Sequence, residues 1–533
     1  MAEESALPPR RKINPVVSAG AVALIAICIA RVANVSAWYG PTNDEPAHIA
    51  GGYDALHGVP EIEIEHPPLA RAIFAWPLRG APEPGVHDMF GFRRGGALLA
   101  SGHYIQNLVR ARRGNLIFLI ALLVGVFFFA RREFGDVAAL IALALVSTLP
   151  PILAHASLAT TDLAVTAMLP VALLATIVWL DRPTPLHTIL LGIAVGVGLL
   201  VKFSFPVFYG LALAFLLPAR ITLRHLRPAA IAIGLSALLV WGGYRFDFGT
   251  LAKAHPRGVE MAHLGAADWV ADVPMPAPLF FGGLLDVKLH NDRGHRAYLF
   301  GTWTNEGRWY YFPAVLLFAT PLAFLILSAA GAVMVIRTRQ WIFALLPLAV
   351  LLPSMASRMN LGIRHVMPMY PLLAMLAGYA AVAVRRRWIV AVLLVWQLVA
   401  TTLAHPDYLG WTNEMALGHP EWISLDSNLD WGQDALPLAR MCQRLRIQRI
   451  GLAITTMADL DRIGMPPRYP LDPNTPARGW VAVSIEQRVA QKFAWLSQAK
   501  RSIRVGRAIT LYWMGETFGL PLLPRVVDFV YRR

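Results

Sequence analysis

The sequence predicts an α-helical membrane protein with many spans that ends in a small α/β domain, and three observations indicate this fold class. Of the 533 residues, 56% are hydrophobic and only 15% are charged, whereas soluble globular proteins carry about 25% charged residues. Apolar runs of about 16 to 25 residues recur as far as position 405, and this is the length that a bilayer-spanning helix needs. Beyond 405 the runs are short and rich in Val, Ile and aromatic residues, which is typical of strands.

The apolar runs number about eleven and are separated by short polar connections. They lie at roughly 15–38, 114–130, 137–154, 162–180, 186–201, 204–219, 229–246, 312–336, 341–357, 365–384 and 388–404. The stretch 186–219 is interrupted only by Lys202. We divide it there because a lysine is costly at the centre of a bilayer and tolerated at its surface. We therefore expect about eleven transmembrane helices.

Basic residues are concentrated in alternate connections. With an odd number of spans, one side collects Arg10 to Lys12, Arg131-Arg132, Arg182, Arg220 to Arg227, Arg337 to Arg339 and Arg385 to Arg387. The positive-inside rule makes this side cytoplasmic, so we expect the N-terminus inside and the C-terminus outside. This bias explains the net charge of +15. Because no nucleic-acid-binding motif accompanies the charge, we exclude nucleic acid as a partner.

The expected exterior side carries two long loops and the C-terminal domain. We divide the chain into a cytoplasmic N-terminus (1–13), a multi-span membrane domain (14–405, with exterior loops 39–112 and 247–311) and an exterior α/β domain (406–533). Long loops in compact proteins are usually functional. In the first loop, prolines ahead of an apolar run predict a short interfacial helix over 67–78.

The pattern after 405 alternates between strands and helices. We predict strands over 447–455, 479–484 and 502–513, and helices over 432–446 and 486–498. A segment of about 120 residues is large enough to fold as a domain of its own.

Two acidic positions on the exterior side are candidates for catalysis. Asp44 and Glu45 follow the first span within a proline-flanked turn. The alternative to a catalytic role is that they are solvated charges at the start of a loop. Asp162 begins the fourth span after two threonines, where a helix N-cap is the alternative. Adjacent carboxylates at the mouth of a span are costly unless a polar site uses them.

Several basic residues also lie on the exterior side, against the charge bias of the membrane domain. Lys202, Arg364 and His365 are candidates for binding a phosphate, because arginine acts as a bidentate clamp and lysine as a point charge. Arg71 in the first loop is a further candidate. The alternative for each is an anchor that reaches the lipid head groups.

The run from Asp426 to Asp434 is dense in hydrogen-bonding side chains and precedes a predicted helix. From spacing alone, capping and turn formation explain such a run. The further candidates for contacts to an acceptor are His66, Asn428, Asp430, Trp431 and Gln433.

Acids and bases that face one another at a membrane surface suit the transfer of a group from a phosphate-linked lipid to a hydroxyl. A carboxylate takes the proton from the hydroxyl, and cations stabilise the departing phosphate. The spans hold the lipid tail and so position the donor.

The order of several motifs resembles that of GT-C class membrane glycosyltransferases, in the branch similar to protein O-mannosyltransferases and the aminoarabinose transferase of lipid A. The stretches concerned cover nearly the whole chain: Asp44-Glu45, Glu65 to Leu69, Ala159 to Asp162, Gly198 to Lys202, Gly307 to Pro313, Asn360 to Pro368, Pro406 to Leu409 and Asp430 to Gln433. The chain looks most like a bacterial subgroup with a C-terminal Asp-Trp-Gly-Gln motif.

The resemblance implies a GT-C-like fold, a polyprenyl-phosphate sugar as donor, and transfer with inversion to a hydroxyl of a glycan, lipid or protein. It implies that Asp44 is the catalytic base beside Glu45, and that Asp162 is the second acid. Lys202 and Arg364 are matched to the donor phosphate. The implied location is the bacterial cytoplasmic membrane, among membrane lipids, with the active site facing the periplasm or exterior. The chain lacks the inserted lumenal domain of the protein mannosyltransferases and carries a C-terminal domain instead.

No cofactor is expected to be required, but a divalent metal is a further hypothesis. Asp44, Glu45, His48 and His66 place oxygen and nitrogen ligands in one loop. Glu45 and His48 are the candidate ligands, although the spacing matches no known metal site.

Other classes of protein remain as alternatives. A transporter or flippase for lipid-linked sugars needs polar residues within its spans, and the centres of these spans are almost free of Asp, Glu and Arg. A non-catalytic membrane scaffold would leave the acidic pair and the exterior cations without a role. An oligosaccharide ligase with diphosphate-linked donors would require more cations at the phosphate.

Overall fold

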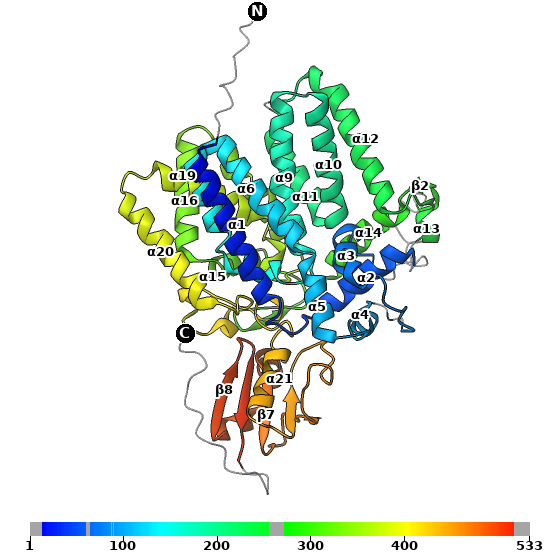
Figure 1. Ribbon diagram of the computed structural model, residues 1–533, viewed down its shortest axis with the longest axis vertical. Helices are drawn as coiled ribbons and strands as arrows, with labels where there is room; N and C mark the ends of the chain where they lie inside the picture. The colour runs from blue at the N-terminus through cyan, green and yellow to red at the C-terminus, as the bar shows by residue number, and fades with distance from the viewer. Residues whose placement is uncertain are drawn as a thin grey trace, which may run out of the picture.

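The computed structural model describes residues 13–515 except 60–63, 87, 89, 219 and 255–270. Most of these residues form a helical domain, and a small sheet domain lies at one end of it, opposite the end where the chain begins (Figure 1). The expected cytoplasmic N-terminus lies outside the described residues apart from its last position. The end of the C-terminal domain and part of the second exterior loop also lie outside them.

Among the described residues, five helices are long and apolar enough to cross a membrane, or up to seven if each bent pair is one span. The five are Pro15–Val35 (α1), Tyr104–Phe134 (α5 and α6), Asp162–Asp181 (α9), Leu223–Gly243 (α12 and the turn before it) and Arg387–Ala404 (α20). The bent pairs are Asp136–Val146 with Pro150–Ala156 (α7 and α8, 66°) and Tyr311–Ala319 with Leu322–Arg337 (α15 and α16, 119°). These helices make the chain an integral membrane protein.

The remaining apolar segments form shorter helices, namely Pro185–Val201 (α10), Ser204–Leu216 (α11), Ile342–Ala356 (α17 and α18) and Met369–Ala383 (α19). Every apolar segment expected from the sequence is helical. Length and composition support fewer spans than the eleven expected, so that number stays a prediction. The division at Lys202 is confirmed, because α10 ends at Val201 and α11 begins at Ser204.

The end of the helical domain near the N-terminus gathers basic connections. Arg132 in the last turn of α6 and Arg220 after α11 both form ion pairs with Asp181 at the end of α9. Asn14, just before α1, donates its backbone N–H to Asp136 Oδ2 at 3.3 Å. These connections therefore share one end of the bundle, as the charge pattern predicts.

The first exterior loop folds into helices Glu45–His57 (α2), Pro68–Ala75 (α3) and Phe92–Leu99 (α4), followed by Tyr104–Arg113 (α5), which runs into Leu116–Phe134 (α6). The helix expected over 67–78 is confirmed as α3 with the 3-10 turn Trp76–Leu78, and Pro68 occupies its first position. Helices α2 and α3 pack closely because Gly52 has no side chain. A Cβ there would lie 1.9 Å from the carbonyl oxygen of Arg71.

The described part of the second exterior loop contains a long helix and two short antiparallel strand pairs. The helix is Pro278–Arg293 (α14), and the pairs are Phe248–Gly249 (β1) with Met275–Pro276 (β2), and Ala297–Leu299 (β3) with Thr302–Thr304 (β4). Leu299 forms an isolated bridge with Ser424. The loop therefore contacts the segment that leads into the C-terminal domain.

The C-terminal domain is a five-stranded mixed sheet with strand order β6-β5-β7-β9-β8. Its elements are Ala435–Arg444 (α21), Ile450–Ala453 (β5), Arg468–Pro470 (β6), Trp480–Ser484 (β7), Ile485–Gln491 (α22), Arg501–Val505 (β8) and Ile509–Trp513 (β9). Strand β5 is parallel to β6 and β7, and the other pairs are antiparallel. Val481 and Val483 enter a small core on one face of the sheet, while Ala482 enters the larger core on the other face.

Of the five elements expected in this domain, one is wrong and four are confirmed, including the strands over 447–455 and 479–484, which are β5 and β7. The single strand expected over 502–513 is the hairpin of β8 and β9, because Gly506 takes a φ of +60° and the chain reverses there. Strand β6 was not expected, since its three residues have too little length and alternation to mark a strand. The predicted helices are present as α21, and as α22 followed by a 3-10 turn.

The segment between α20 and α21 joins the two domains. The hydroxyl of Tyr39 accepts the backbone N–H groups of Tyr408 and Leu409 at 2.7 and 2.9 Å. Gly40 donates its N–H to the carbonyl of Gln433 at 2.8 Å. The start of the first exterior loop is therefore held by the C-terminal segment.

Candidate active site

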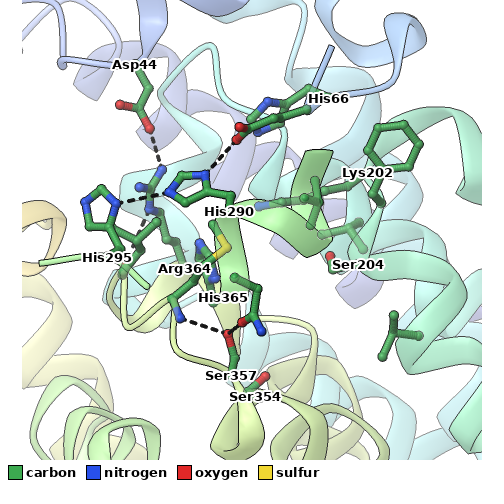
Figure 2. Close-up of a pocket in the computed structure, with 18 of the residues that line it drawn as sticks. Asp44, His66, Lys202, Ser204, His290, His295, Ser354, Ser357, Arg364 and His365 are labelled. Atoms are coloured by element: carbon green, nitrogen blue, oxygen red, sulfur yellow. Dashed lines mark hydrogen bonds and ion pairs between the residues drawn. The ribbon is translucent and has the colours of Figure 1, made fainter. Parts of the chain in front are cut away.

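A cavity of about 910 Å³ lies among the exterior loops and the helix ends that meet them (Figure 2). Apolar side chains such as Val207, Phe208 and Leu284 form part of its wall. Asp44, Lys202 and Arg364 project into the same space from three different segments (Figure 2). An apolar wall with a few convergent polar groups is typical of a ligand site.

Asp44 and Arg364 form an ion pair in this cavity. Arg364 Nη1 donates to Asp44 Oδ2 at 2.6 Å, as Figure 2 shows. The side chain of Asp44, at the start of α2, is 32% exposed, whereas that of Arg364 is 9% exposed. Arg364 Nε donates to the carbonyl of Leu361 at 3.0 Å. The guanidinium is therefore fixed, and one edge of the Asp44 carboxylate remains accessible.

The charge of Arg364 is stabilised by the acids around it. Burial on its own would lower the pKa of the guanidinium, but Asp44, Asp162 and Asp426 raise that pKa above its ordinary value. Arg364 is therefore a permanent cation at a largely buried position, where its field on a bound anion is stronger than in water.

Lys202 brings a second cation to the cavity. It follows the last residue of α10 and donates from Nζ to Asp162 Oδ1 at the first residue of α9. Asp162 is 1% exposed and is not among the described residues that line the cavity. Asp162 therefore lies behind Lys202, and its direct partner is this cation.

Glu45 has a different environment from its neighbour Asp44. Its carboxylate and the Arg112 guanidinium are both fully buried and form two hydrogen bonds of 2.7 Å. Glu45 also accepts the backbone N–H groups of Thr42 and Ala159 at 2.8 Å each. Glu45 does not line the cavity. It ties the first loop to α5 and to the turn before α9.

The other candidates in the first loop are divided between cavity and core. His48 and His66 both line the cavity, and their rings meet edge to face at 4.7 Å. Arg71 is 1% exposed and donates to the backbone carbonyls of His66 and Ala47 at 3.2 and 3.5 Å. Arg71 is not among the residues that line the cavity, so the structure does not bring it to Lys202 and Arg364.

His365 lines the cavity beside Arg364. Burial lowers its pKa well below the usual range, and the Lys202 and Arg364 cations lower it further. The imidazole is therefore neutral and can offer a hydrogen bond to a phosphate, but no charge.

The C-terminal candidates mostly hold other parts of the site. Asn428 Oδ1 accepts the N–H of Ile363, next to Arg364, at 2.8 Å. Asp430 Oδ2 accepts the N–H of Glu486 at 3.2 Å. Trp431 is the member of this group that lines the cavity, and its ring centroid lies 4.4 Å from Arg364 Cζ. Gln433 receives the Trp431 N–H on its Oε1 at 2.8 Å.

Sequence reasoning missed several residues of the site. His290 of α14 bonds to Glu65 at 2.9 Å and to His295 at 3.3 Å, and all three line the cavity. Asp426 lines it too, with a φ of +53°. The two histidines lie in the second exterior loop, whose length was the available signal. Nothing in the local pattern separates Asp426 from the capping residues around it.

No group of three or more His, Cys, Asp and Glu suited to a metal ion is found within the part of the chain that the structure describes. Of the two candidate ligands, His48 lines the cavity, whereas Glu45 is engaged by Arg112.

The arrangement combines one accessible carboxylate with two cations in a partly apolar cavity at the end of membrane helices. A carboxylate of this kind can accept a proton from a hydroxyl. The cations can stabilise negative charge that develops on a leaving group nearby. The fold and the cavity thus define a membrane protein with a site suited to an anionic, partly apolar ligand.

The sequence matches a family model over part of its length. Residues 97–244 match the model of the dolichyl-phosphate-mannose-protein mannosyltransferases. This region contains Arg112, Asp162 and Lys202. No curated protein matches the chain in sequence.

Solved structures with a similar fold share little sequence with the chain. ArnT from Cupriavidus metallidurans in the apo state is 12% identical, with a TM-score of 0.50 over 93% of this chain and 98% of that one. ArnT bound to undecaprenyl phosphate gives 13% identity and a TM-score of 0.49 over the same shares. The Archaeoglobus fulgidus oligosaccharyltransferase tethered to an acceptor peptide gives 12% and 0.47, over 89% of this chain and 70% of that one.

Residues 97–244 are thus similar in sequence to this family, and the chain as a whole is similar in fold to ArnT. The subgroup with a C-terminal Asp-Trp-Gly-Gln motif stays a prediction.

Proposed function

We propose that the protein transfers a monosaccharide from a polyprenyl-phosphate donor to a hydroxyl acceptor at the exterior face of the membrane, with Asp44 as the base. The observation that carries this proposal is the Asp44–Arg364 pair beside Lys202 in a cavity with an apolar wall. The family whose model matches is named for a dolichyl-phosphate sugar, which is a donor of this class.

The reaction is a single displacement at the anomeric carbon. The acceptor oxygen attacks that carbon as its proton passes to Asp44 Oδ1, whose partner oxygen is held by Arg364. The bond between the carbon and the phosphate oxygen breaks, and its electron pair leaves with polyprenyl phosphate. The product therefore has the inverted configuration.

The cations act on the departing phosphate. A polyprenyl-phosphate sugar carries one negative charge, and the leaving polyprenyl phosphate gains a second. Arg364 and Lys202 stabilise the charge as it develops, which lowers the barrier more than it strengthens ground-state binding. Asp162 acts as a positioning residue, since it pairs with Lys202 from behind the wall.

Glu45 is likewise a positioning residue in this proposal. Its bonds to Arg112 and to Ala159 hold the turn that presents Asp44. The polyprenyl chain lies along the apolar wall formed by side chains of α11 and α14, such as Val207, Phe208 and Leu284. The acceptor is a glycan, lipid or protein hydroxyl that reaches Asp44 from the exterior side of a bacterial cytoplasmic membrane.

The test is a donor assay with purified protein in lipid nanodiscs. A panel of polyprenyl-phosphate monosaccharides is offered with candidate acceptors, and release of polyprenyl phosphate is followed. We expect one donor to turn over, and we expect Asp44→Asn to lower turnover by at least about 100-fold, the typical contribution of a general base.

A matched control separates catalysis from folding. Asp54 lies in α2, the helix that Asp44 precedes. It forms a buried ion pair of 2.8 Å with Arg94 and does not line the cavity. Asp54→Asn makes the same chemical change to a paired aspartate, and it should retain turnover because Arg94 keeps Glu83 as an acidic partner at 3.3 Å. Near wild-type activity of Asp44→Asn would refute the base assignment. If the donor binds without turnover, and both variants bind it as the wild type does, a transporter or scaffold would be favoured.

A further inference from the structure

Trp431 belongs to the segment that enters the C-terminal domain, yet its indole forms part of the cavity wall. The residue is 2% exposed. Arg364 Cζ lies 4.4 Å from the centroid of the ring, which is the geometry of a cation–π contact. The guanidinium is thus bounded by a carboxylate at one edge and by an aromatic face.

The backbone around the same residue holds the turn that carries Asp44. The carbonyl of Trp431 accepts the N–H of Asn43 at 3.0 Å, and the carbonyl of Gln433 accepts the N–H of Gly40 at 2.8 Å. Between them, Gly432 takes a φ of +88°, and a Cβ there would lie 2.9 Å from Asn43 Oδ1. The C-terminal segment and the catalytic turn therefore fit together without space for a side chain.

We propose that Trp431 is a positioning residue that sets the place of Arg364 relative to Asp44, so that the C-terminal domain completes the phosphate-binding site. This inference rests on the proposed function and deepens it. The ring fixes the plane of the Arg364 guanidinium, while the backbone carbonyl fixes the turn on which Asp44 stands. One residue thereby sets the spacing between the base and the leaving-group clamp.

The hydrogen bonds of Arg364 show why its plane matters. Nε donates to Leu361 and Nη1 donates to Asp44, while Nη2 has no partner among the described residues. Rotation of the guanidinium about its own axis would turn Nη2 away from a bound phosphate. A flat aromatic surface resists that rotation, because arginine stacks on aromatic faces through its whole plane.

Residues before and after Trp431 in the sequence form hydrogen bonds with the sheet domain. Asp430 Oδ2 accepts the N–H of Glu486 at 3.2 Å, and Asp434 Oδ2 accepts the N–H of Ala508 at 2.7 Å. The position of the indole therefore depends on the sheet.

The test is a double-mutant cycle read by binding of undecaprenyl phosphate to the purified full chain in nanodiscs. The variants are Trp431→Leu, Trp431→Phe, Arg364→Lys and the two combinations. We expect Trp431→Leu to weaken binding about tenfold and Trp431→Phe to weaken it less than about threefold, because phenylalanine keeps an aromatic face. In the Arg364→Lys background, the Trp431 substitutions should have little further effect, since the two residues act through one contact.

Trp480→Phe is the matched control. Trp480 is a buried tryptophan of β7 that contacts Trp513 at 5.1 Å and does not line the cavity. Its substitution should leave binding unchanged. Where Trp431→Leu does not fold, as judged by size-exclusion chromatography, the cycle with Trp431→Phe carries the test.

Equal losses of affinity with and without Arg364 would overturn the proposal, because they would make Trp431 a general packing residue. Unchanged binding in Trp431→Leu would overturn it as well. Failure of the proposed function looks different: the wild type would transfer no sugar, while the coupling between Trp431 and Arg364 in phosphate binding would persist and support the positioning role.

Discussion

Asp44 and Glu45 are adjacent in the sequence and have opposite surroundings in the fold. Asp44 faces the cavity and Arg364, while Glu45 is enclosed by Arg112 and backbone N–H groups. They start a helix, in which neighbouring residues point about 100° apart. The sequence therefore predicts an acidic pair, but which of the two is exposed depends on partners that lie far along the chain.

This difference predicts that neutralising Glu45 lowers the stability of the fold much more than neutralising Asp44 does. Glu45→Gln leaves Arg112 as a buried charge without its counter-ion, and breaking such a pair typically costs about 3–5 kcal/mol. We therefore expect a large fall in the thermal unfolding temperature. Tryptophan fluorescence of the protein in nanodiscs measures it. Asp44→Asn should change the unfolding temperature less, because Asp44 is partly exposed and Arg364 keeps Asp162 and Asp426 as nearby acids.

The double variant Glu45→Gln with Arg112→Gln is the control, because removing both charges avoids the isolated cation. It should be more stable than Glu45→Gln alone. A Glu45→Gln protein that unfolds like the wild type but transfers no sugar would contradict the positioning role and would place Glu45 in the chemistry.

At the scale of elements, local patterns predicted most helices and failed where one residue redirects the chain. Residues 502–513 have the composition of a single strand, and the reversal between β8 and β9 depends on Gly506. A Cβ on Gly506 would lie 2.3 Å from the carboxyl of Asp434, so the turn is shaped by a helix start 72 positions earlier. A contact at that separation leaves no local signal in the sequence.

The joint between the sheet and the membrane domain should be sensitive to pH through Asp430. Burial raises the pKa of Asp430 to about 7, and the nearby Glu486 raises it too, against hydrogen bonds from Ser484 and from backbone N–H groups. An unfolded aspartate loses its proton near pH 4. Between about pH 4 and 7 the folded state thus binds one more proton, so the stability contributed by this group falls as pH rises.

Asp430→Asn removes this titration but keeps an oxygen that can accept the Glu486 N–H. Between pH 5 and pH 7.5 the wild type should therefore lose more free energy of unfolding than the variant, by at most about 2.7 kcal/mol, which is two pH units at about 1.4 kcal/mol each. Tryptophan fluorescence of both proteins, scanned at each pH, measures the difference. Identical pH dependence of the two unfolding temperatures would show that Asp430 is not the group responsible.

On the scale of the whole molecule, the site is assembled from segments that are far apart in the chain. Asp44, Lys202, Arg364 and Trp431 come from the first loop, the break between α10 and α11, the loop before α19 and the C-terminal segment. The charge pattern of the sequence predicted that these residues share one side of the membrane. It could not predict that Lys202 pairs with Asp162 and Arg364 with Asp44, because the pairing depends on how the helices pack around one another.

The same charge pattern predicts how the molecule lies in the membrane. Basic connections after α6 and α11 meet at one end of the bundle, and the sheet domain lies at the other (Figure 1). Positive-inside orientation then places the sheet and the cavity outside the cell. With eleven spans, a cysteine at exposed Asn474 in the sheet domain and one at exposed Gln340 after α16 lie on opposite sides of the membrane.

A membrane-impermeant maleimide applied to spheroplasts distinguishes the two orientations. The native Cys28 and Cys442 are buried and should react slowly, so each single variant reports its own new site. Asn474→Cys should be labelled in intact spheroplasts, and Gln340→Cys only after permeabilisation. The reverse pattern would show that the cavity faces the cytoplasm, which is the face on which polyprenyl-phosphate sugars are made. Labelling of both sites from outside would contradict an odd number of spans between Gln340 and the sheet domain.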